Sequence, residues 1–312
     1  MTKERVLAIL TTITILIFMS FGTVLSKLAL RDVHPLSLTW LTVGIGMLLL
    51  TFYTFVIRRE HIPHMSRQVW LMIIAIGFFN FVTGRIAGMY ALSFLSATTN
   101  TYLSNFIGFL TMGMSIIILK ESPTLFQVLG ALVALAGLRV FFQKIPAPSE
   151  MLGVLLAAIS ITGVAYTNNI ARKLAIDTKN SISNYVISTL ALLIGGSITV
   201  IIGLIFDHPL QVSGWKNWSI IFYLAIVSVA IGLTVWNQIL RVLRSYEASI
   251  LGASTVIWTA LLAIPFLGEH LDFHQIIGIG LMLVGLILVQ VRIGRFSTLF
   301  HRSKPMEQND AP

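Results

Sequence analysis

One arginine, Arg85, has surroundings that are unusual for a charged side chain. It lies in the stretch FFNFVTGRIAG at residues 78–88, with apolar sequence on both sides. An arginine at the centre of a bilayer costs roughly 2.5–3.5 kcal/mol on insertion scales, so it should face a cavity or a partner. A guanidinium matches carboxylate and phosphate groups bidentately. Arg85 is therefore predicted to bind the anionic group of a solute; the alternative is a structural arginine that bonds backbone carbonyls or snorkels outward.

Uncharged polar and aromatic side chains in apolar stretches form a second set of candidates. Thr162, Tyr166 and Asn169 recur at i, i+4 and i+7, which places them on one face of a helix. Amides and hydroxyls inside a membrane need partners, which other helices or a solute with amino and carboxyl groups would supply. For each, the alternative is helix packing or, for Trp and Tyr, the interfacial belt. The predicted solute-binding residues are Arg85, Asn105, Tyr166, Asn169, Trp236, Trp40, Tyr102 and Trp258.

The chain lacks the residue sets that several other chemistries need. Its 12 acidic and 7 His residues fall in loops, at helix ends or in the tail, and Cys is absent. A membrane enzyme would need a catalytic set within its spans, and a thiolate site or disulfide would need Cys. We therefore expect no catalytic residue, no metal and no cofactor. A missing GxxxxGK[ST] loop argues against an ATP-driven pump, and the lack of an intramembrane acid argues against proton coupling.

The elements that must position these residues are membrane helices. The 312 residues are 56% hydrophobic and 11% charged, with a mean hydropathy of +0.89. A soluble domain is about 25% charged, and a bilayer helix needs about 20 apolar residues. The first stretch is longer than a signal-peptide core and is expected to be retained. We predict ten spans: Val6–Leu25, Leu36–Ile57, Val69–Leu92, Ala97–Leu119, Thr124–Phe142, Met151–Ala171, Ile182–Phe206, Trp218–Leu240, Ala248–Leu267 and Phe273–Val291.

The basic residues orient these spans. With the N-terminus in the cytoplasm, 15 Lys and Arg residues fall inside and 5 outside, while Arg85 lies within a span. Excess Lys and Arg marks cytoplasmic loops, so both termini are expected there. The net charge of +9 is thus explained without nucleic acid as a partner. Residues 294–312 are polar and are expected to form a disordered cytoplasmic tail.

The second half of the chain repeats the first. Thr111, Glu121 and Gln127 match the same residue types 148 positions on, at Thr259, Glu269 and Gln275. Five spans is an odd number, so the second copy must be inverted, as in many transporters whose solute site lies between the repeats. We expect an all-α integral membrane fold, with one five-helix repeat at residues 1–145 and a second at 146–293. Glycines that share a helix face, in Gly84/Gly88 and in the pairs Gly130/Gly137 and Gly278/Gly285, are interpreted as packing sites. The alternative is that these faces slide during alternating access.

The chain resembles the ten-helix, EamA-type branch of the drug/metabolite transporter superfamily. The matching motifs are YALSFLSA at residues 90–97, Lys120-Glu121, Leu267-Gly268-Glu269 and QIIG at 275–278. The family commonly has a Glu-Pro pair in the fourth and ninth helices, where this chain has Ile107-Gly108 and Thr255-Val256. A bend there must therefore come from Gly108 or from packing. Glu121 and Glu269 are expected to be structural, bound to nearby backbone or basic groups.

The resemblance implies a solute carrier, and residues and resemblance together favour an exporter of small polar metabolites such as amino acids. The expected partners are a small-molecule substrate and the lipid bilayer of a bacterial plasma membrane, with the chain a monomer or homodimer. One alternative is an organic-anion, sugar-phosphate or nucleotide-sugar antiporter, which would favour several basic residues at the site, with Lys27 a possible second. Another is a membrane sensor or scaffold that does not transport.

Overall fold

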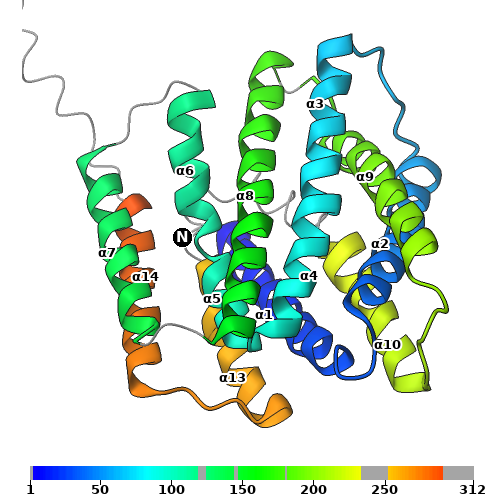
Figure 1. Ribbon diagram of the computed structural model, residues 1–312. Helices are drawn as coiled ribbons and strands as arrows, with labels where there is room; N and C mark the ends of the chain where they lie inside the picture. The colour runs from blue at the N-terminus through cyan, green and yellow to red at the C-terminus, as the bar shows by residue number, and fades with distance from the viewer. Residues whose placement is uncertain (1–2, 119–123, 144–146, 180, 233–251, 291–312) are drawn as a thin grey trace, which may run out of the picture.

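The computed structural model describes residues 3–118, 124–143, 147–179, 181–232 and 252–290 as a bundle of helices (Figure 1). Within these ranges no strand occurs. Three segments, labelled η, are π-helical, with hydrogen bonds that reach five residues back instead of four. The elements are α1 (Lys3–Ala29), α2 (Pro35–Phe52), η1 (Tyr53–Ile57), α3 (Arg67–Gly77), η2 (Phe78–Gly84), α4 (Arg85–Phe94), α5 (Ala97–Ser104), α6 (Ile107–Ile118), α7 (Leu125–Phe141), α8 (Pro148–Asp177), α9 (Asn184–Phe206), α10 (Trp215–Tyr223), η3 (Leu224–Ile231), α13 (Thr255–Leu267) and α14 (Phe273–Gln290).

Helices coincide with the predicted spans wherever the structure describes them. Six are long and apolar enough to cross a membrane, and four shorter apolar helices lie in the remaining predicted spans, at Leu125–Phe141, Trp215–Ile231, Thr255–Leu267 and Phe273–Val289. The prediction of a helical fold with several apolar, membrane-length helices is thus confirmed for the described residues. The exact number of crossings and the side of the termini stay predictions, and the tail at 294–312 lies outside the described residues.

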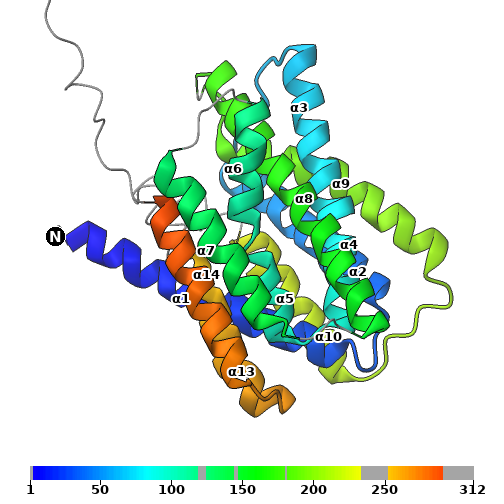
Figure 2. The same ribbon diagram turned by 60° about the vertical axis from the view of Figure 1, so that its left-hand side comes forward.

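Glycines determine the contact between α7 and α14, which lie side by side in both views of the structure (Figure 1 and Figure 2). A Cβ added to Gly130 would stand 2.5 Å from the carbonyl oxygen of Gly285, and one added to Gly137 would stand 2.9 Å from that of Gly278. The two helices therefore run antiparallel with their backbones in contact, the kind of approach that small residues permit in lipid. The packing role predicted for these four glycines is confirmed.

The helices α2 and α9 also pack antiparallel and are joined along their length. The hydroxyls of Thr54 and Thr189 lie 2.8 Å apart in a buried contact. At the opposite end of α2, the Trp40 indole donates to Asp207, which follows α9, over 2.8 Å. These helices contain the second span of each predicted repeat, so their antiparallel packing agrees with inversion.

Two charges from distant parts of the chain hold the junction between α4 and α5. The Lys27 ammonium donates to the carbonyls of Leu92 (2.9 Å) and Ser93 (3.1 Å) at the end of α4. The Glu269 carboxylate accepts the N–H groups of Ala97 (2.6 Å) and Thr98 (3.2 Å) at the start of α5. Each charge complements the helix dipole that it faces. The structural role expected for Glu269 is confirmed, while Glu121 lies outside the described residues.

The fourth predicted span is broken between α5 and α6, at Asn105 and Phe106. The break precedes Gly108, and only one contact, a Leu286 methyl 3.7 Å away, would meet a Cβ there. Another interruption occurs at Ser254, directly before α13. Under the 148-residue offset Phe106 corresponds to Ser254, so both predicted repeats interrupt the helix at the same place without proline.

Candidate functional site

Arg85 directly follows the π-helical segment η2. Its backbone N–H bonds the carbonyl of Asn80, five residues earlier, and so closes that segment. A Cβ added to Gly84 would stand 3.1 Å from the carbonyl oxygen of Phe79, closer than most side chains tolerate. Because glycine has no Cβ, Gly84 leaves space for the Phe79 carbonyl in this wider π-helical turn. Because π-helical turns are rare and occur often at functional sites, this one singles out the region beside Arg85.

A second π-helical segment, η3, occupies the corresponding place in the other predicted repeat. The 148-residue offset maps residues 78–84 onto 226–232, which overlaps η3 over most of its length. Here the N–H of Gly232 bonds the carbonyl of Val227. A Cβ added to Gly232 would stand 3.0 Å from that same carbonyl oxygen. Gly232 and Val227 correspond to Gly84 and Phe79, so the two segments share one local geometry.

The Arg85 side chain joins the two segments. Its Nη2 donates to the backbone carbonyl of Ser228, in η3, over 3.4 Å. Among the described residues no Asp or Glu lies within ion-pair distance of this guanidinium. A guanidinium has five N–H donors. The described bond engages one of them, and at 3.4 Å it is long and therefore weak. The positive charge of Arg85 therefore lies between the two predicted repeats, and its described acceptor is a neutral carbonyl oxygen. Such a charge attracts anions.

The helix α8 forms a wall beside η2 and α4. The Ser160 hydroxyl donates to the Gly84 carbonyl over 2.7 Å, and a Cβ added to Gly88 would stand 2.9 Å from that hydroxyl. The packing role predicted for the Gly84/Gly88 pair is thus confirmed. Further along α8, the half-buried Tyr166 ring meets Phe79 edge to face, with centroids 4.7 Å apart. Among the predicted site residues, Tyr166 is the one that a described contact links to the segment beside Arg85.

The two predicted asparagines bond backbone groups. The Asn169 side chain is 1% exposed and donates to the carbonyls of Thr111 and Ala165, both over 3.0 Å. The first of these bonds ties α8 to α6. Asn105 ends α5 and donates to the Thr101 carbonyl of its own helix over 3.0 Å. These contacts give Asn169 a role in packing α8 against α6, and give Asn105 a local bond within its own helix.

Tyr102 and Trp258 lie apart from Arg85 in the contacts that they make. Tyr102 is fully buried and stacks on Phe141 with centroids 4.1 Å apart, and its hydroxyl donates to the Gly278 carbonyl over 3.5 Å. The Trp258 indole donates to the Ser254 hydroxyl over 3.1 Å, within the region of the helix interruption. Tyr102 thus links α5 to both α7 and α14, and the Trp258 bond stabilises the start of α13.

Trp40 binds a buried carboxylate that the sequence did not single out. Asp207 is 9% exposed and accepts bonds from the Ser37 hydroxyl and the Trp40 indole, both over 2.8 Å. Its partners are more than 160 residues away in the chain, so no local motif could mark it. The remaining candidate, Trp236, lies outside the described residues.

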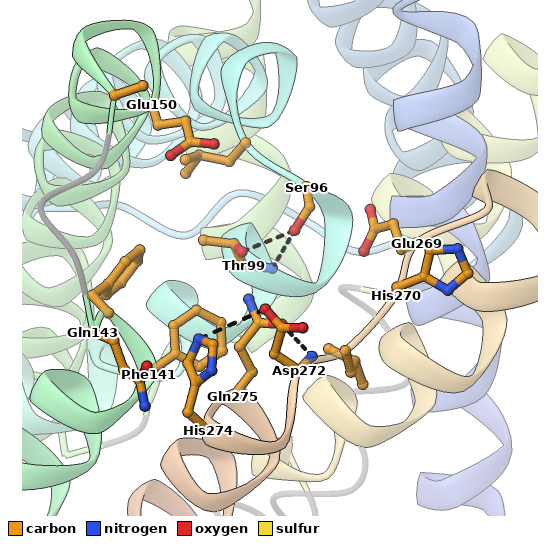
Figure 3. Close-up of a pocket in the computed structure, with 14 residues that line it drawn as sticks. Ser96, Thr99, Phe141, Gln143, Glu150, Glu269, His270, Asp272, His274 and Gln275 are labelled. Carbon is orange, nitrogen blue, oxygen red and sulfur yellow. Dashed lines mark hydrogen bonds and ion pairs between the residues drawn. The ribbon is translucent and has the colours of Figure 1, made fainter.

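A polar cavity of about 570 Å³ opens where the α4–α5 junction meets the loops before α8 and α14 (Figure 3). Glu150, Glu269 and Asp272 line it together with His270 and His274. The His274 Nε2 lies 3.9 Å from an Asp272 oxygen. In the described ranges no three His, Asp or Glu side chains gather in an arrangement that could hold a metal ion. The sequence reasoning missed this cavity, because its walls come from three separate loops.

Comparison with known proteins identifies the fold. A crystal structure described only as that of a protein matches with a TM-score of 0.63 at 18% identity, covering 92% of this chain and 96% of that one. At this identity the likeness concerns the fold alone. No curated protein matches the chain.

The model of the EamA-like transporter family matches this chain twice, at residues 6–143 and again at residues 149–291. The two matches take in nearly all of the sequence, which agrees with the paired π-helical segments and the paired helix interruptions. This two-repeat chain of membrane helices belongs to the EamA-like transporter family.

Proposed function

We propose that this protein exports small polar metabolites that carry an anionic group, such as amino acids, by alternating access between two inverted repeats. The observation that supports this most is Arg85, which lies between η2 and η3 and makes its described side-chain bond to a neutral carbonyl. A solute carboxylate is a stronger partner for a guanidinium than a carbonyl is, because its negative charge attracts the guanidinium and its two oxygens can accept two parallel N–H bonds.

The proposed site is built around Arg85, with Tyr166 on the wall of α8. Asn105, Asn169, Trp40, Tyr102, Trp236 and Trp258 remain candidates for a different stage of the transport cycle. The contacts of all but Trp236, which lies outside the described residues, favour packing in this conformation. In the proposed topology ten helices cross the plasma membrane, both termini are cytoplasmic, and the polar cavity lies on the outer side. One chain suffices for the pathway.

The sugar-phosphate alternative ranks lower. It favours several basic groups at the site, and Lys27 was the second candidate. Its ammonium instead bonds the Leu92 and Ser93 carbonyls at the end of α4. A single guanidinium suits a solute with one carboxylate better than a solute with a phosphate group of higher charge.

The test uses purified protein in liposomes loaded with a broad panel of labelled metabolites. We expect flux of amino acids or organic acids, with Arg85→Ala weakening the anionic solutes most. Arg139→Ala is the matched control, because the Arg139 guanidinium also bonds backbone carbonyls, those of Phe142 and Gln143 at the end of α7. The proposal fails if no solute moves. Its mechanistic part fails if Arg85→Ala and Arg139→Ala leave every solute unaffected alike.

A further inference from the structure

The bond between Arg85 and Ser228 spans 143 positions of the chain and connects one matched segment to the other. Arg85 belongs to residues matched by the first copy of the family model, and Ser228 to those matched by the second. Alternating access moves one repeat against the other. If the repeats separate between η2 and η3 during this movement, the bond between Arg85 and Ser228 must break.

The local structure holds the donor and acceptor in place. On the donor side, the N–H of Arg85 closes η2. On the acceptor side, Ser228 lies inside η3, one residue after Val227, whose carbonyl takes the closing bond from Gly232. The serine hydroxyl also lies against Gly22 of α1, where an added Cβ would stand 3.0 Å away. The donor and the acceptor of the bond thus both lie on backbone that packs closely because a neighbouring glycine has no side chain.

We propose that Arg85 and the Ser228 carbonyl form a tether that solute releases, so that the carrier works as an exchanger. This inference rests on the proposed function. In the empty carrier the tether holds the repeats together and slows reorientation. An anionic solute binds the Arg85 guanidinium in place of the Ser228 carbonyl. The bond between the repeats is then absent, so the loaded carrier reorients. A ligand shifts a conformational equilibrium only by its different affinity for the two states, and competition for Arg85 provides that difference.

The size of the effect follows from the single bond. The Arg85 bond is long at 3.4 Å, so we assign to it the net contribution of a typical hydrogen bond, which changes an equilibrium or rate by about twofold to tenfold. Exchange, in which the carrier returns loaded, should therefore be about twofold to tenfold faster than net efflux, in which it returns empty.

The experiment compares efflux of a labelled amino acid from proteoliposomes with and without the same unlabelled amino acid outside. For the native protein, external solute should accelerate efflux about twofold to tenfold. Equal rates with and without external solute would overturn the tether while leaving the proposed function intact. Absence of movement in both conditions would overturn the proposed function itself. The native protein alone thus separates the two failures.

Glycine variants then test the tether without touching Arg85. Gly232→Ala crowds the Val227 carbonyl, and Gly22→Ala crowds the Ser228 hydroxyl. Either should shift η3, raise net efflux and bring it closer to the exchange rate. Gly280→Ala, where a Cβ would meet nothing within 4 Å, is the control and should keep the native ratio. If Gly232→Ala and Gly22→Ala both melt like the native protein and keep its ratio of exchange to efflux, the assignment of the tether to Ser228 is wrong.

Discussion

Removing the Glu269 carboxylate should destabilise the protein through the start of α5. The carboxylate accepts bonds from the Ala97 N–H (2.6 Å), the Thr98 N–H (3.2 Å) and the Thr98 hydroxyl (2.8 Å). Glu269→Ala leaves all three donors without this acceptor. Loss of a helix N-cap costs about 1 kcal/mol, and loss of a hydrogen bond to a charged group costs about 1.5–3 kcal/mol. Because these two costs describe the same donors and are not fully additive, we expect a total loss of about 2–4 kcal/mol.

The assay is unfolding of the purified protein in mixed micelles, followed by tryptophan fluorescence as the proportion of denaturing detergent rises. Glu150→Ala is the matched control, because Glu150 lines the same cavity but is exposed, in the first turn of α8. It should lose at most the helix-dipole contribution of about 0.3–1 kcal/mol. Glu269→Gln keeps one acceptor oxygen and should fall between the two. If Glu269→Ala is no less stable than Glu150→Ala, the capping role is wrong.

Two further variants test the packing of the bundle. Gly285→Ala would place a Cβ 2.5 Å from the Gly130 carbonyl oxygen, and should lower the melting temperature because overpacking costs about 1–3 kcal/mol. Gly280→Ala, which meets nothing nearby, should raise it slightly, since alanine favours a helix over glycine by about 0.5–1 kcal/mol; equal melting of the two variants would contradict the proposed contact. Trp40→Phe should cost about 1.5–3 kcal/mol in detergent unfolding, because the buried Asp207 carboxylate loses its indole donor. A Trp40→Phe protein as stable as the native one would show that this bond contributes nothing.

Apolar stretches, glycine spacing and basic loops were informative because they act through composition and local periodicity. Gly130 and Gly137 were identified as packing sites from spacing alone, and the structure places them against α14. Helical periodicity also put Tyr166 and Asn169 on one face of α8. It could not show that Asn169 would be buried against α6 while Tyr166 would meet Phe79, because the neighbouring helix decides which part of a face is covered.

The contacts on which the proposed site depends most could not be predicted from residue types. Ser228 takes part through its backbone carbonyl, which every residue possesses. The π-helical turns differ from α-helical ones by one residue in their hydrogen bonding, within segments that are apolar in either case. One signal was available: Gly84 and Gly232 match at the 148-residue offset and both end up beside the carbonyl five residues earlier.

The most direct measurement of the central claim compares an amino acid with its amide, in which an uncharged carboxamide group replaces the carboxylate, as solutes in proteoliposomes. The initial rates at low concentration give a selectivity ratio for the native protein and for Arg85→Ala. If Arg85 binds the carboxylate, the native protein should prefer the acid by about tenfold to a hundredfold, and Arg85→Ala should move both solutes at similar rates. An Arg85→Ala protein that still transports and retains the native preference for the acid would contradict the claim.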